Sequence, residues 1–312
     1  MVDDRFRRRT WRHVDFDADE LVEVRRRAGT SVSVVVPARD EQATVGDVVA
    51  TAVGLRERGL IDQVLVVDGG STDATVERAR AAGAAVVAQA KLLPEAGPGH
   101  GKGDALWKGL AATTGDLVVF LDADLRDPDP RYVVGLLGPL LTVPEVALVK
   151  ACYDRPLRTA GQTAAGGGRV TELTARPLLA AFWPQLSWLA QPLAGEYAGR
   201  RAVLEAVPFA AGYGVELALL IDVVERFGDD AIGQVDVGQR LHDHQPLPAL
   251  GRMAAEIVGV AAARLVSDGR LSGGSSGLLP QPDRAPDGRL TLRVHRVNVD
   301  ERPPLAQLRT RA

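Results

Sequence analysis

Several features that define whole classes of protein are scarce in this sequence. Its 312 residues contain one cysteine, Cys152, which excludes a fold held by intramolecular disulfides and fits the reducing conditions of the cytoplasm. The longest apolar runs, such as Leu117–Leu121, have the length of strands, whereas a membrane-spanning helix needs about 20 apolar residues. The basic N-terminus is not followed by an apolar stretch, so it lacks the layout of a secretory signal. We therefore expect a cytoplasmic protein without a stable membrane anchor.

The net charge is also small, and lysines are few. The formal net charge is only −3 and the arginines are spread along the chain, so we expect no nucleic-acid partner. Only 4 of the 37 basic residues are lysines, a bias that we attribute to a GC-rich genome. In such a protein, a retained lysine can mark a place where a compact ammonium group is needed. Hydrophobic residues make up 46% of the chain, which is enough for a sizeable core and excludes wholly disordered and collagen-like proteins.

Residues 31–155 alternate between apolar strands and helix-like segments. Continuous apolar strands separated by helices predict an α/β fold with a mostly parallel sheet that is covered on both faces. The expected strands are 31–37, 62–68, 84–89, 116–124 and 146–153, and the expected helices are 42–58, 73–82, 103–113 and 130–141.

The flanking regions have a different character. Residues 1–30 are charged and irregular, so we expect a solvated N-terminal extension, with an oligomer contact as the alternative. A second, smaller region contains a helix at 214–227 and a strand at 231–237. The C-terminal part is rich in Gly, Ser, Pro and Asp and predicts a flexible tail, with a single edge strand at 291–299 as an option. The expected division of the chain is 1–30, 31–155, 156–266 and 267–312.

The strongest chemical signal is a pair of acids directly after an apolar strand. Asp122 and Asp124 follow the fourth expected strand, and Pro37 and Asp68 end two others. In a parallel sheet, ligands bind at the carboxyl ends of the strands. Two carboxylates at i and i+2 suit a hard divalent cation that bridges the phosphates of a nucleotide. A pair of loop or helix-capping aspartates is the alternative.

Two other segments fit a nucleotide at the same edge of the sheet. After Pro37, the backbone of Ala38 and Arg39 can lie along a flat base, although Glu41 can instead cap the next helix. Asp68 can accept hydrogen bonds from a base or ribose, and the glycine that follows it permits a close backbone approach.

A glycine-rich segment, GHGKGDA, contains Lys102 just before an expected helix. Glycines beside a helix start suit a phosphate contact, but the spacing is not that of a P-loop. A mobile loop without a ligand is the alternative reading.

Two polar segments lie in the second region. In GGGRVTEL, a glycine nest followed by Arg169 and a helix start can form a second anionic site, because arginine gives bidentate hydrogen bonds to phosphate or carboxylate. In GQRLHDHQPL, the imidazole of His242 can complete a metal site whose other ligands are oxygens, or it can be an ordinary surface histidine.

Together, these segments resemble the retaining GT-A glycosyltransferases and, within them, the actinobacterial glucosyl-3-phosphoglycerate synthases. The resemblance covers residues 10–266 and rests on VSVVVPARDE, VLVVDGGSTDAT, GKGDALWKGL, VVFLDADLRDPDP, GGGRVTELTARPLL, QPLAGEYAGRR and VGQRLHDHQPL. It implies a GT-A fold in which residues 156–266 bind the acceptor and complete the metal site. It also implies a homodimer that transfers a sugar from a nucleotide donor, usually UDP-glucose, to the 2-hydroxyl of 3-phosphoglycerate.

The resemblance implies a role for each matching residue. Asp124 and His242 would bind Mg²⁺, with Mn²⁺ as the alternative, and the catalytic candidates are Glu216, Asp124 and Arg169. The residues expected to hold the nucleotide sugar are Pro37, Ala38, Arg39, Glu41, Asp68, Gly69, Lys102, Asp122, Ala123, Asp124, Leu193 and Glu196. The residues expected to hold the acceptor are Gly168, Arg169, Thr171, Tyr213 and His244.

Some alternatives stay open at this stage. Retention without an obvious protein nucleophile favours front-side attack by the acceptor hydroxyl, with Glu216 as a covalent nucleophile as the rival. The segment Asp243–Pro246 reads DHQP where the family usually reads RNRP, which leaves the donor sugar and the acceptor open. Other readings are a mannosyl-3-phosphoglycerate synthase that uses GDP-mannose, a polyprenyl-phosphate glycosyltransferase, and a nucleotide-sugar-binding protein without activity.

Overall fold

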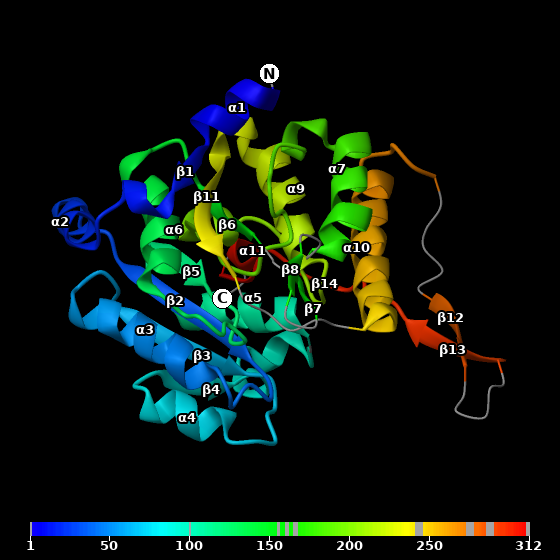
Figure 1. Cartoon of the computed structure of the whole chain (residues 1–312), viewed down its shortest axis with the longest axis horizontal. Coiled ribbons are helices and arrows are strands. Elements are labelled where there is room, and N and C mark those ends of the chain that lie inside the picture. Colours follow the sequence, from blue (N-terminus) through cyan, green and yellow to red (C-terminus); the bar gives the residue numbers. More distant parts are fainter. Residues whose placement is uncertain are drawn as a thin grey trace.

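The computed structural model describes residues 2–99, 101–154, 157–159, 162–164, 168–240, 246–272, 278–284 and 290–309. A central sheet of eight strands in the order β1-β11-β6-β9-β5-β2-β3-β4 runs through the molecule, with helices packed on both faces (Figure 1). The α/β fold that the alternating pattern predicted is therefore confirmed.

The parallel strands are short apolar runs, as expected where both faces of a sheet are buried. Val34, Val35 and Val36 of the central strand β2 are each 0% exposed. All the strands that the sequence predicted between residues 31 and 155 are present, and so is the one expected at 231–237. Their bounds are β2 (Val32–Ala38), β3 (Gln63–Asp68), β4 (Ala85–Ala88), β5 (Leu117–Phe120), β6 (Leu148–Asp154) and β11 (Ile232–Gln239).

One strand inside the sheet was not predicted. Strand β9 (Tyr197–Arg200) runs antiparallel between β5 and β6, with Tyr197 paired to both Phe120 and Lys150. It is only four residues long and contains Gly199 and Arg200, so it carries no apolar run. Because β9 and β11 both come from residues 156–266, the sheet extends across the expected boundary at residue 155.

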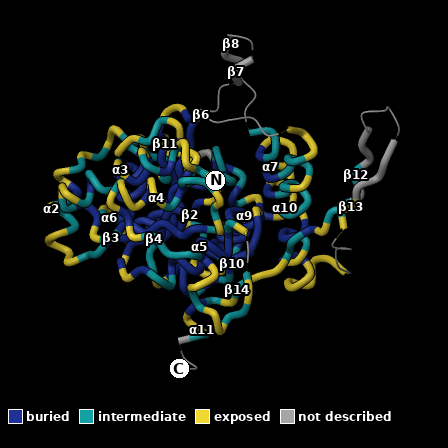
Figure 2. The backbone as a smooth tube through the Cα atoms, turned by 90° about the horizontal axis from the view of Figure 1, so that it is seen from below, coloured by how far each residue is buried: buried dark blue, intermediate teal, exposed yellow. Residues whose placement is uncertain are grey.

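The helices form two layers, each over its own hydrophobic core, so that the strands are buried between them (Figure 2). One layer contains α5 (Lys102–Ala112), α7 (Arg176–Phe182), α8 (Arg201–Leu204), α9 (Val215–Phe227) and α10 (Leu247–Ser267). The other contains α2 (Ala18–Ala28), α3 (Val45–Glu57), α4 (Thr75–Ala81) and α6 (Pro130–Thr142). Within the described residues, every helix is too short or too polar to span a membrane.

The expectation of a solvated extension at residues 1–30 is wrong. After helix α1 (Val2–Arg8), strand β1 (Thr10–Arg12) adds a parallel edge to the sheet beside β11. Leu21 of α2 is buried, and the side chain of Phe16 lies against Gly138. The segment holds few apolar residues among many charged ones, which is why its sequence suggested an irregular, solvated extension.

The C-terminal part also differs from the expected tail. Strands β12 (Leu278–Arg284) and β13 (Leu290–Arg296) pair with each other beside α10, so β13 is not an edge strand of the central sheet (Figure 1). Strand β14 (Glu301–Arg302) pairs with β10 (Phe209–Ala210), and helix α11 (Leu305–Arg309) buries Leu305. The chain therefore returns to the domain after β13. A separate hairpin joins β7 (Leu157–Thr159) and β8 (Gln162–Ala164).

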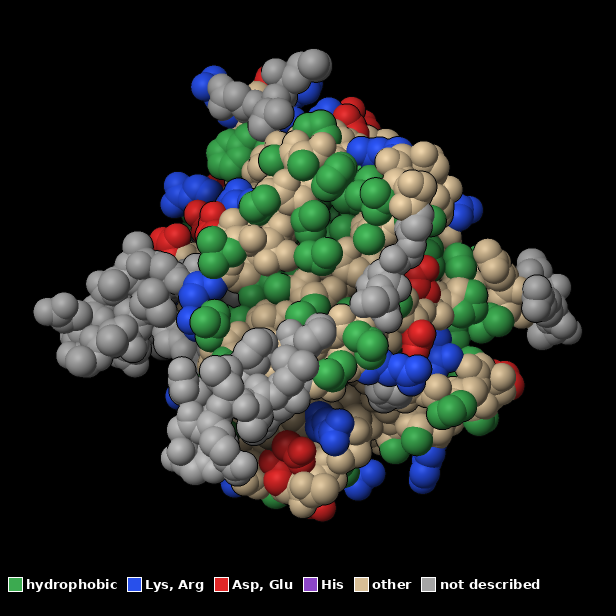
Figure 3. All heavy atoms as spheres, turned by 90° about the vertical axis from the view of Figure 1, so that its right-hand side faces the viewer, with side chains coloured by type: hydrophobic (Ala, Val, Ile, Leu, Met, Phe, Trp, Pro, Cys, Tyr) green, Lys and Arg blue, Asp and Glu red, His purple; other side chains and the backbone are tan. Residues whose placement is uncertain are grey.

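Hydrophobic side chains gather on the face that carries α7 and α10 (Figure 3). We call this surface the α7–α10 face; its exposed apolar residues are Leu173, Phe182, Leu247, Val258 and Val266.

Candidate active site

The carboxyl ends of three strands meet at one edge of the sheet, as the sequence predicted. Ala38 at the end of β2 is in register with Asp68 at the end of β3, and Pro37 is in register with Val67. Asp122 and Ala123 come after Leu121, which follows the end of β5, the other neighbour of β2. The proposed nucleotide segments are thus brought together by the parallel register.

The loops after β2 and β3 are tied to each other by side-chain hydrogen bonds. Asp40, in the left-handed backbone region at φ 57°, accepts from the Thr72 N–H across 2.8 Å. Asp73 accepts in turn from the Gln42 N–H across 3.1 Å. A non-glycine residue at positive φ needs such support, and here reciprocal aspartates supply it. These hydrogen bonds therefore fix the loop after β2 against the loop after β3.

Asp68 and Gly69 shape the turn after β3, a structural role in addition to the nucleotide contacts that the sequence predicted for them. The Asp68 carboxylate accepts from the Ser71 N–H across 3.0 Å, so it already caps the turn that it begins. A Cβ on Gly69 would lie 3.4 Å from Arg39 Cβ, which explains the small residue between the two loops. The side chain of Arg39 is 72% exposed, so any contact of residue 39 with a buried base would come from its backbone.

Lys102 lies between two carboxylates at the centre of the site. Its Nζ is 2.6 Å from Asp122 Oδ1 and 2.8 Å from Glu216 Oε1. Burial disfavours the ammonium, but the two carboxylates outweigh it and raise the pKa of Lys102 well above its ordinary value. A permanently charged ammonium therefore joins the aspartate pair to α9, and Glu216 is paired rather than free.

Two glycines allow this arrangement. Gly101 has φ 94°, and a Cβ there would lie 2.8 Å from the Ala211 carbonyl oxygen. A Cβ on Gly103 would overlap the Ala210 carbonyl oxygen. The start of α5 can therefore approach the turn before α9 closely enough for Lys102 to reach Glu216.

Arg240, at the end of β11, is a functional candidate that the sequence reading did not single out. Its Nη2 lies 2.7 Å from Asp124 Oδ1 and 3.4 Å from Asp122 Oδ2. Its Nη1 lies 3.1 Å from Glu196 Oε1 and its side chain is only 4% exposed. The one signal available was its place in the polar loop that follows the strand expected at 231–237, two residues before His242.

Glu196 belongs to the buried wall behind Arg240. Its Oε2 accepts from the Tyr153 hydroxyl across 2.7 Å, and that hydroxyl in turn accepts from Arg240 across 3.0 Å. The preceding residue, Gly195, cannot carry a side chain because a Cβ would overlap Asp122 Oδ2. Leu193 is partly buried and packs against the hydrophobic core. The segment predicted to shape the donor pocket therefore adjoins Asp122 directly.

The acidic groups at this edge fit a divalent cation. Burial, with the negative charges of Asp124 and Asp122 next in size, raises the pKa of Glu41 to about 7. Ala123 holds the loop by accepting from the Thr44 hydroxyl across 2.7 Å. Among the described residues, no cluster of three carboxylate, imidazole or thiol groups is arranged to hold a metal. A cation at Asp122 and Asp124 would thus need oxygens of a diphosphate and a further residue.

Lys150 forms a second, buried cation behind this edge. Its Nζ donates to the Ala194 carbonyl and lies 4.5 Å from the centre of the Tyr197 ring. Burial lowers the pKa of Lys150 to about 8, and the charge of Lys102 also lowers it. A charged residue inside an apolar strand, as Lys150 is in β6, is a sequence signal of such a buried cation.

The acceptor candidates Gly168, Arg169 and Thr171 lie at the start of a helical segment whose first turns, Thr171–Ala175, are a π-helix. Gly168 has φ 79°, and its carbonyl accepts from the Glu172 N–H across 2.9 Å. Thr171 is buried and Arg169 is half-buried. The described residues therefore present the expected glycine turn followed by arginine.

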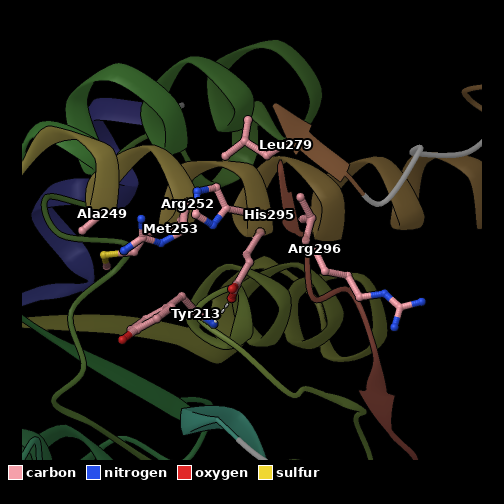
Figure 4. A pocket seen from close by; sticks show the side chains of 9 residues that line it. Tyr213, Ala249, Arg252, Met253, Leu279, His295 and Arg296 are labelled. Carbon is pink, nitrogen blue, oxygen red and sulfur yellow. Dashed lines mark hydrogen bonds between the residues drawn. The ribbon is translucent and has the colours of Figure 1, made fainter. Parts of the chain in front are cut away.

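Tyr213 lies in the turn that enters α9, shortly before Glu216. It is 50% exposed and lines a cavity of about 170 Å³ between α10 and β13, together with Arg252, Met253 and His295 (Figure 4). Its backbone N–H donates to Glu256 Oε2 across 2.7 Å. The described contacts of Tyr213 thus link the turn before α9 to α10 and do not reach Asp124. His242 and His244 lie outside the described residues.

Comparisons with known proteins agree with this geometry. The family described as Glycosyl transferase family 2 matches residues 33–150. The glucosyl-3-phosphoglycerate synthase of Mycolicibacterium smegmatis is 48% identical over 313 residues, covering 100% of this chain and 98% of that protein.

Solved structures are similar over almost the whole chain. The mannosyl-3-phosphoglycerate synthase of Rubrobacter xylanophilus superimposes with a TM-score of 0.91 at 40% identity, covering 98% of each chain. The glucosyl-3-phosphoglycerate synthase of Mycobacterium tuberculosis, in complex with Mn²⁺, UDP-glucose and phosphoglyceric acid, superimposes with a TM-score of 0.82 at 45% identity, covering 94% of this chain and 95% of that one.

Another crystal structure of the M. tuberculosis enzyme, in complex with Mg²⁺ and UDP, gives a TM-score of 0.84 at 44% identity, covering 96% of this chain and 99% of that one. Full-length identity of this size, together with the GT-A arrangement of sheet and acids, shows the family. This chain belongs to the glucosyl-3-phosphoglycerate synthases and carries their glycosyl transferase family 2 domain.

Proposed function

We propose that this chain transfers glucose from UDP-glucose to the 2-hydroxyl of 3-phosphoglycerate, with Mg²⁺ or Mn²⁺ as cofactor, and releases UDP. The observation that carries the proposal is the assembly of Lys102, Arg240, Asp122 and Asp124 at the carboxyl edge of the sheet. Two carboxylates between two cations suit a diphosphate and its metal ion. The ligands named for the M. tuberculosis enzyme support the same donor, acceptor and metals.

The chain's own residues would mainly position the substrates and balance charge. A Mg²⁺ ion held by Asp124 and His242, with Asp122 beside the nucleotide sugar, would act as a Lewis acid toward the diphosphate leaving group. Lys102 and Arg240 orient the two aspartates through the contacts described above. Preorganised charge in a water-poor site stabilises the departing diphosphate more strongly than it would in water.

The acceptor would bind at the start of the π-helical segment. The guanidinium of Arg169 and the turn at Gly168 suit the phosphate group of 3-phosphoglycerate, with Thr171 beside them. This places the acceptor in a site separate from that of the nucleotide, so that the two substrates can be tested independently.

We propose retention by front-side attack, in which an oxygen of the leaving diphosphate takes the proton of the acceptor hydroxyl. The rival is a covalent intermediate on Glu216. The pairing of Glu216 with Lys102, and its 5% exposure, support the first mechanism because a carboxylate held by an ammonium is a weaker nucleophile.

A mannosyl transfer from GDP-mannose is the second candidate. The observation that favours it is the high TM-score of 0.91 to the mannosyl-3-phosphoglycerate synthase of R. xylanophilus. Because the two sugars differ only at one hydroxyl, the fold alone does not choose between them.

The test is a matrix of donors against acceptors. UDP-glucose, GDP-glucose and GDP-mannose are each incubated with 3-phosphoglycerate, glycerate or buffer, and release of the nucleoside diphosphate is measured with Mg²⁺ and with EDTA. We expect the fastest release with UDP-glucose and 3-phosphoglycerate, and none with EDTA or with the Asp124→Asn variant. Faster release with GDP-mannose would establish the second candidate. Binding of UDP without release in any combination would indicate a nucleotide-sugar-binding protein.

We also propose that the protein is a cytoplasmic homodimer. The exposed apolar residues of the α7–α10 face support a partner surface, because monomers rarely leave such residues in contact with water as a group. Light scattering of the wild type and of a Val258→Glu variant tests it. A dimer that becomes monomeric in the variant supports the proposal, and a monomeric wild type contradicts it.

A further inference from the structure

Arg302, close to the C-terminus, binds the glycine-rich loop that leads to Lys102. Its Nη1 donates to the Ala96 carbonyl across 2.6 Å, and its Nη2 donates to the Gly97 carbonyl across 3.4 Å. A Cβ on Gly99 would overlap the same guanidinium, so this loop lies flat against Arg302. The loop is therefore held by a residue that is about two hundred positions away in sequence.

The same guanidinium also binds the first turn of α5. Its Nε lies 2.6 Å from Asp104 Oδ1, and Asp104 is fully buried two residues after Lys102. The other carboxylate oxygen of Asp104 accepts from Gln89 Nε2 across 2.6 Å and lies 3.2 Å from Lys108 Nζ. A carboxylate in this position needs all its partners, because removing one of them leaves a buried charge uncompensated.

The segment around Arg302 is fixed to both sides of the site. Strand β14 pairs with β10, and the Ala211 N–H donates to the Asp300 carbonyl across 2.9 Å. The Ala211 carbonyl in turn accepts from the Asp104 N–H across 3.2 Å. Ala211 begins the turn that enters α9, which carries Glu216. One short C-terminal segment thus holds the elements that supply Lys102 and Glu216.

We propose that Arg302 is a positioning residue for Lys102, and that the C-terminal segment is therefore part of the donor site. Arg302 does not reach Asp122 itself. It fixes the loop and the first turn of α5, so that the ammonium of Lys102 stays between Asp122 and Glu216. The proposal rests on the proposed function only in taking the site of Lys102 to be the nucleotide site. It extends that site, which already includes Glu216 and Arg240, to the C-terminal segment, far outside the residues 33–150 that match glycosyl transferase family 2.

The first experiment compares Arg302→Lys with Arg201→Lys. Lysine at 302 keeps a charge opposite Asp104 but cannot make all the hydrogen bonds to the loop. Arg201 is a matched control, because it is 13% exposed against 12% for Arg302 and binds the other end of α5 through Leu110 and Thr113. The affinity for UDP is measured by calorimetry with Mg²⁺, next to the KM for UDP-glucose and the Tm.

We expect both variants to lose a few degrees of Tm, but only Arg302→Lys to weaken UDP binding and to raise the donor KM, each about tenfold. A structural role alone predicts equal UDP affinity in both variants, which would overturn the proposal. If Arg302→Lys does not fold, Gly99→Ala places a Cβ against both the Arg302 guanidinium and the Asp104 carboxylate without removing either group, and it should weaken UDP binding in the same direction. Because UDP lacks the hexose that is transferred, the result stands even if glucose is not the donor sugar.

A double-mutant cycle tests the route through Lys102. If Arg302 acts by positioning Lys102, then Arg302→Lys added to Lys102→Met should weaken UDP binding by less than about twofold. If the double variant loses the full product of the two single effects, the two residues act independently and the proposal is wrong.

Discussion

The guanidinium of Arg240 donates to the carboxylate of Asp124 across 2.7 Å while its other end lies 3.1 Å from the buried Glu196. Arg240 therefore balances three carboxylates, since Asp122 lies within 3.4 Å as well. This pairing explains how two aspartates can lie side by side, because positive charge from the protein holds them in place.

Replacing Arg240 by an uncharged residue should make the thermal stability of the protein depend more strongly on Mg²⁺ and UDP. In Arg240→Met the three carboxylates lose their shared cation, which costs about 3 kcal/mol because Glu196 is fully buried. We expect Tm to fall by several degrees without Mg²⁺, and Mg²⁺ with UDP to restore more of it than in the wild type. Arg240→Lys, which keeps the charge, should lose less. Equal Tm values for wild type and Arg240→Met without Mg²⁺ would contradict this account.

Substitution at the proposed acceptor site should separate the two substrates. In Arg169→Ala we expect the KM for 3-phosphoglycerate to rise at least about tenfold, because a charge-assisted pair to phosphate is lost. The affinity for UDP should stay close to that of the wild type. Arg176→Ala is the control, because Arg176 belongs to the same segment but binds Glu172 and the Ala190 carbonyl. Equal losses for UDP and 3-phosphoglycerate would refute two separate sites.

The regular part of the fold could be predicted because its signals are local. The strands around Val34 and Val119 are continuous apolar runs, and the helices between them have clear ends. The N-terminal strand at Trp11 and the inserted strand at Tyr197 could not be predicted, because each is short and is stabilised by its neighbours in the sheet. Tertiary pairing, not local pattern, makes them strands.

The residues of the site divide in the same way, into those that local sequence predicts and those that only the folded chain shows. Asp122 and Asp124 were predictable because they follow an apolar strand, and Lys102 because it stands among glycines. Arg240 and Arg302 were not predicted. Nothing in the sequence distinguishes Arg302 from the other arginines, and the only signal for Arg240 was its place two residues before His242. Only the folded chain shows that one of them faces Asp124 and the other faces Asp104.

The buried ammonium of Lys150 should make stability depend on pH in an unusual direction. Its pKa is lowered from 10.5 to about 8, so between these values the folded chain has released a proton that the unfolded chain still holds. Stability from this group therefore rises as pH increases from 8 to 10.5. The free energy of unfolding of the wild type minus that of Lys150→Met should increase by up to roughly 3 kcal/mol across this range. Urea titrations at several pH values measure it, and a flat or falling difference would show that the shift is absent.

A single methyl group should disturb the aspartate pair without altering any charge. A Cβ on Gly195 would overlap Asp122 Oδ2, so in Gly195→Ala the carboxylate must move away from its place beside Lys102. We expect a loss of about 1–3 kcal/mol in stability and a UDP affinity at least about tenfold weaker, because the displaced group is part of the site. Gly54→Ala is the control, since it lies in α3 with nothing within 4 Å of the new Cβ. That variant should gain about 0.5–1 kcal/mol from the lower entropy of its unfolded chain and bind UDP as the wild type does. Unchanged UDP binding in Gly195→Ala would mean that Asp122 can move without cost, and that Asp124 alone carries the metal.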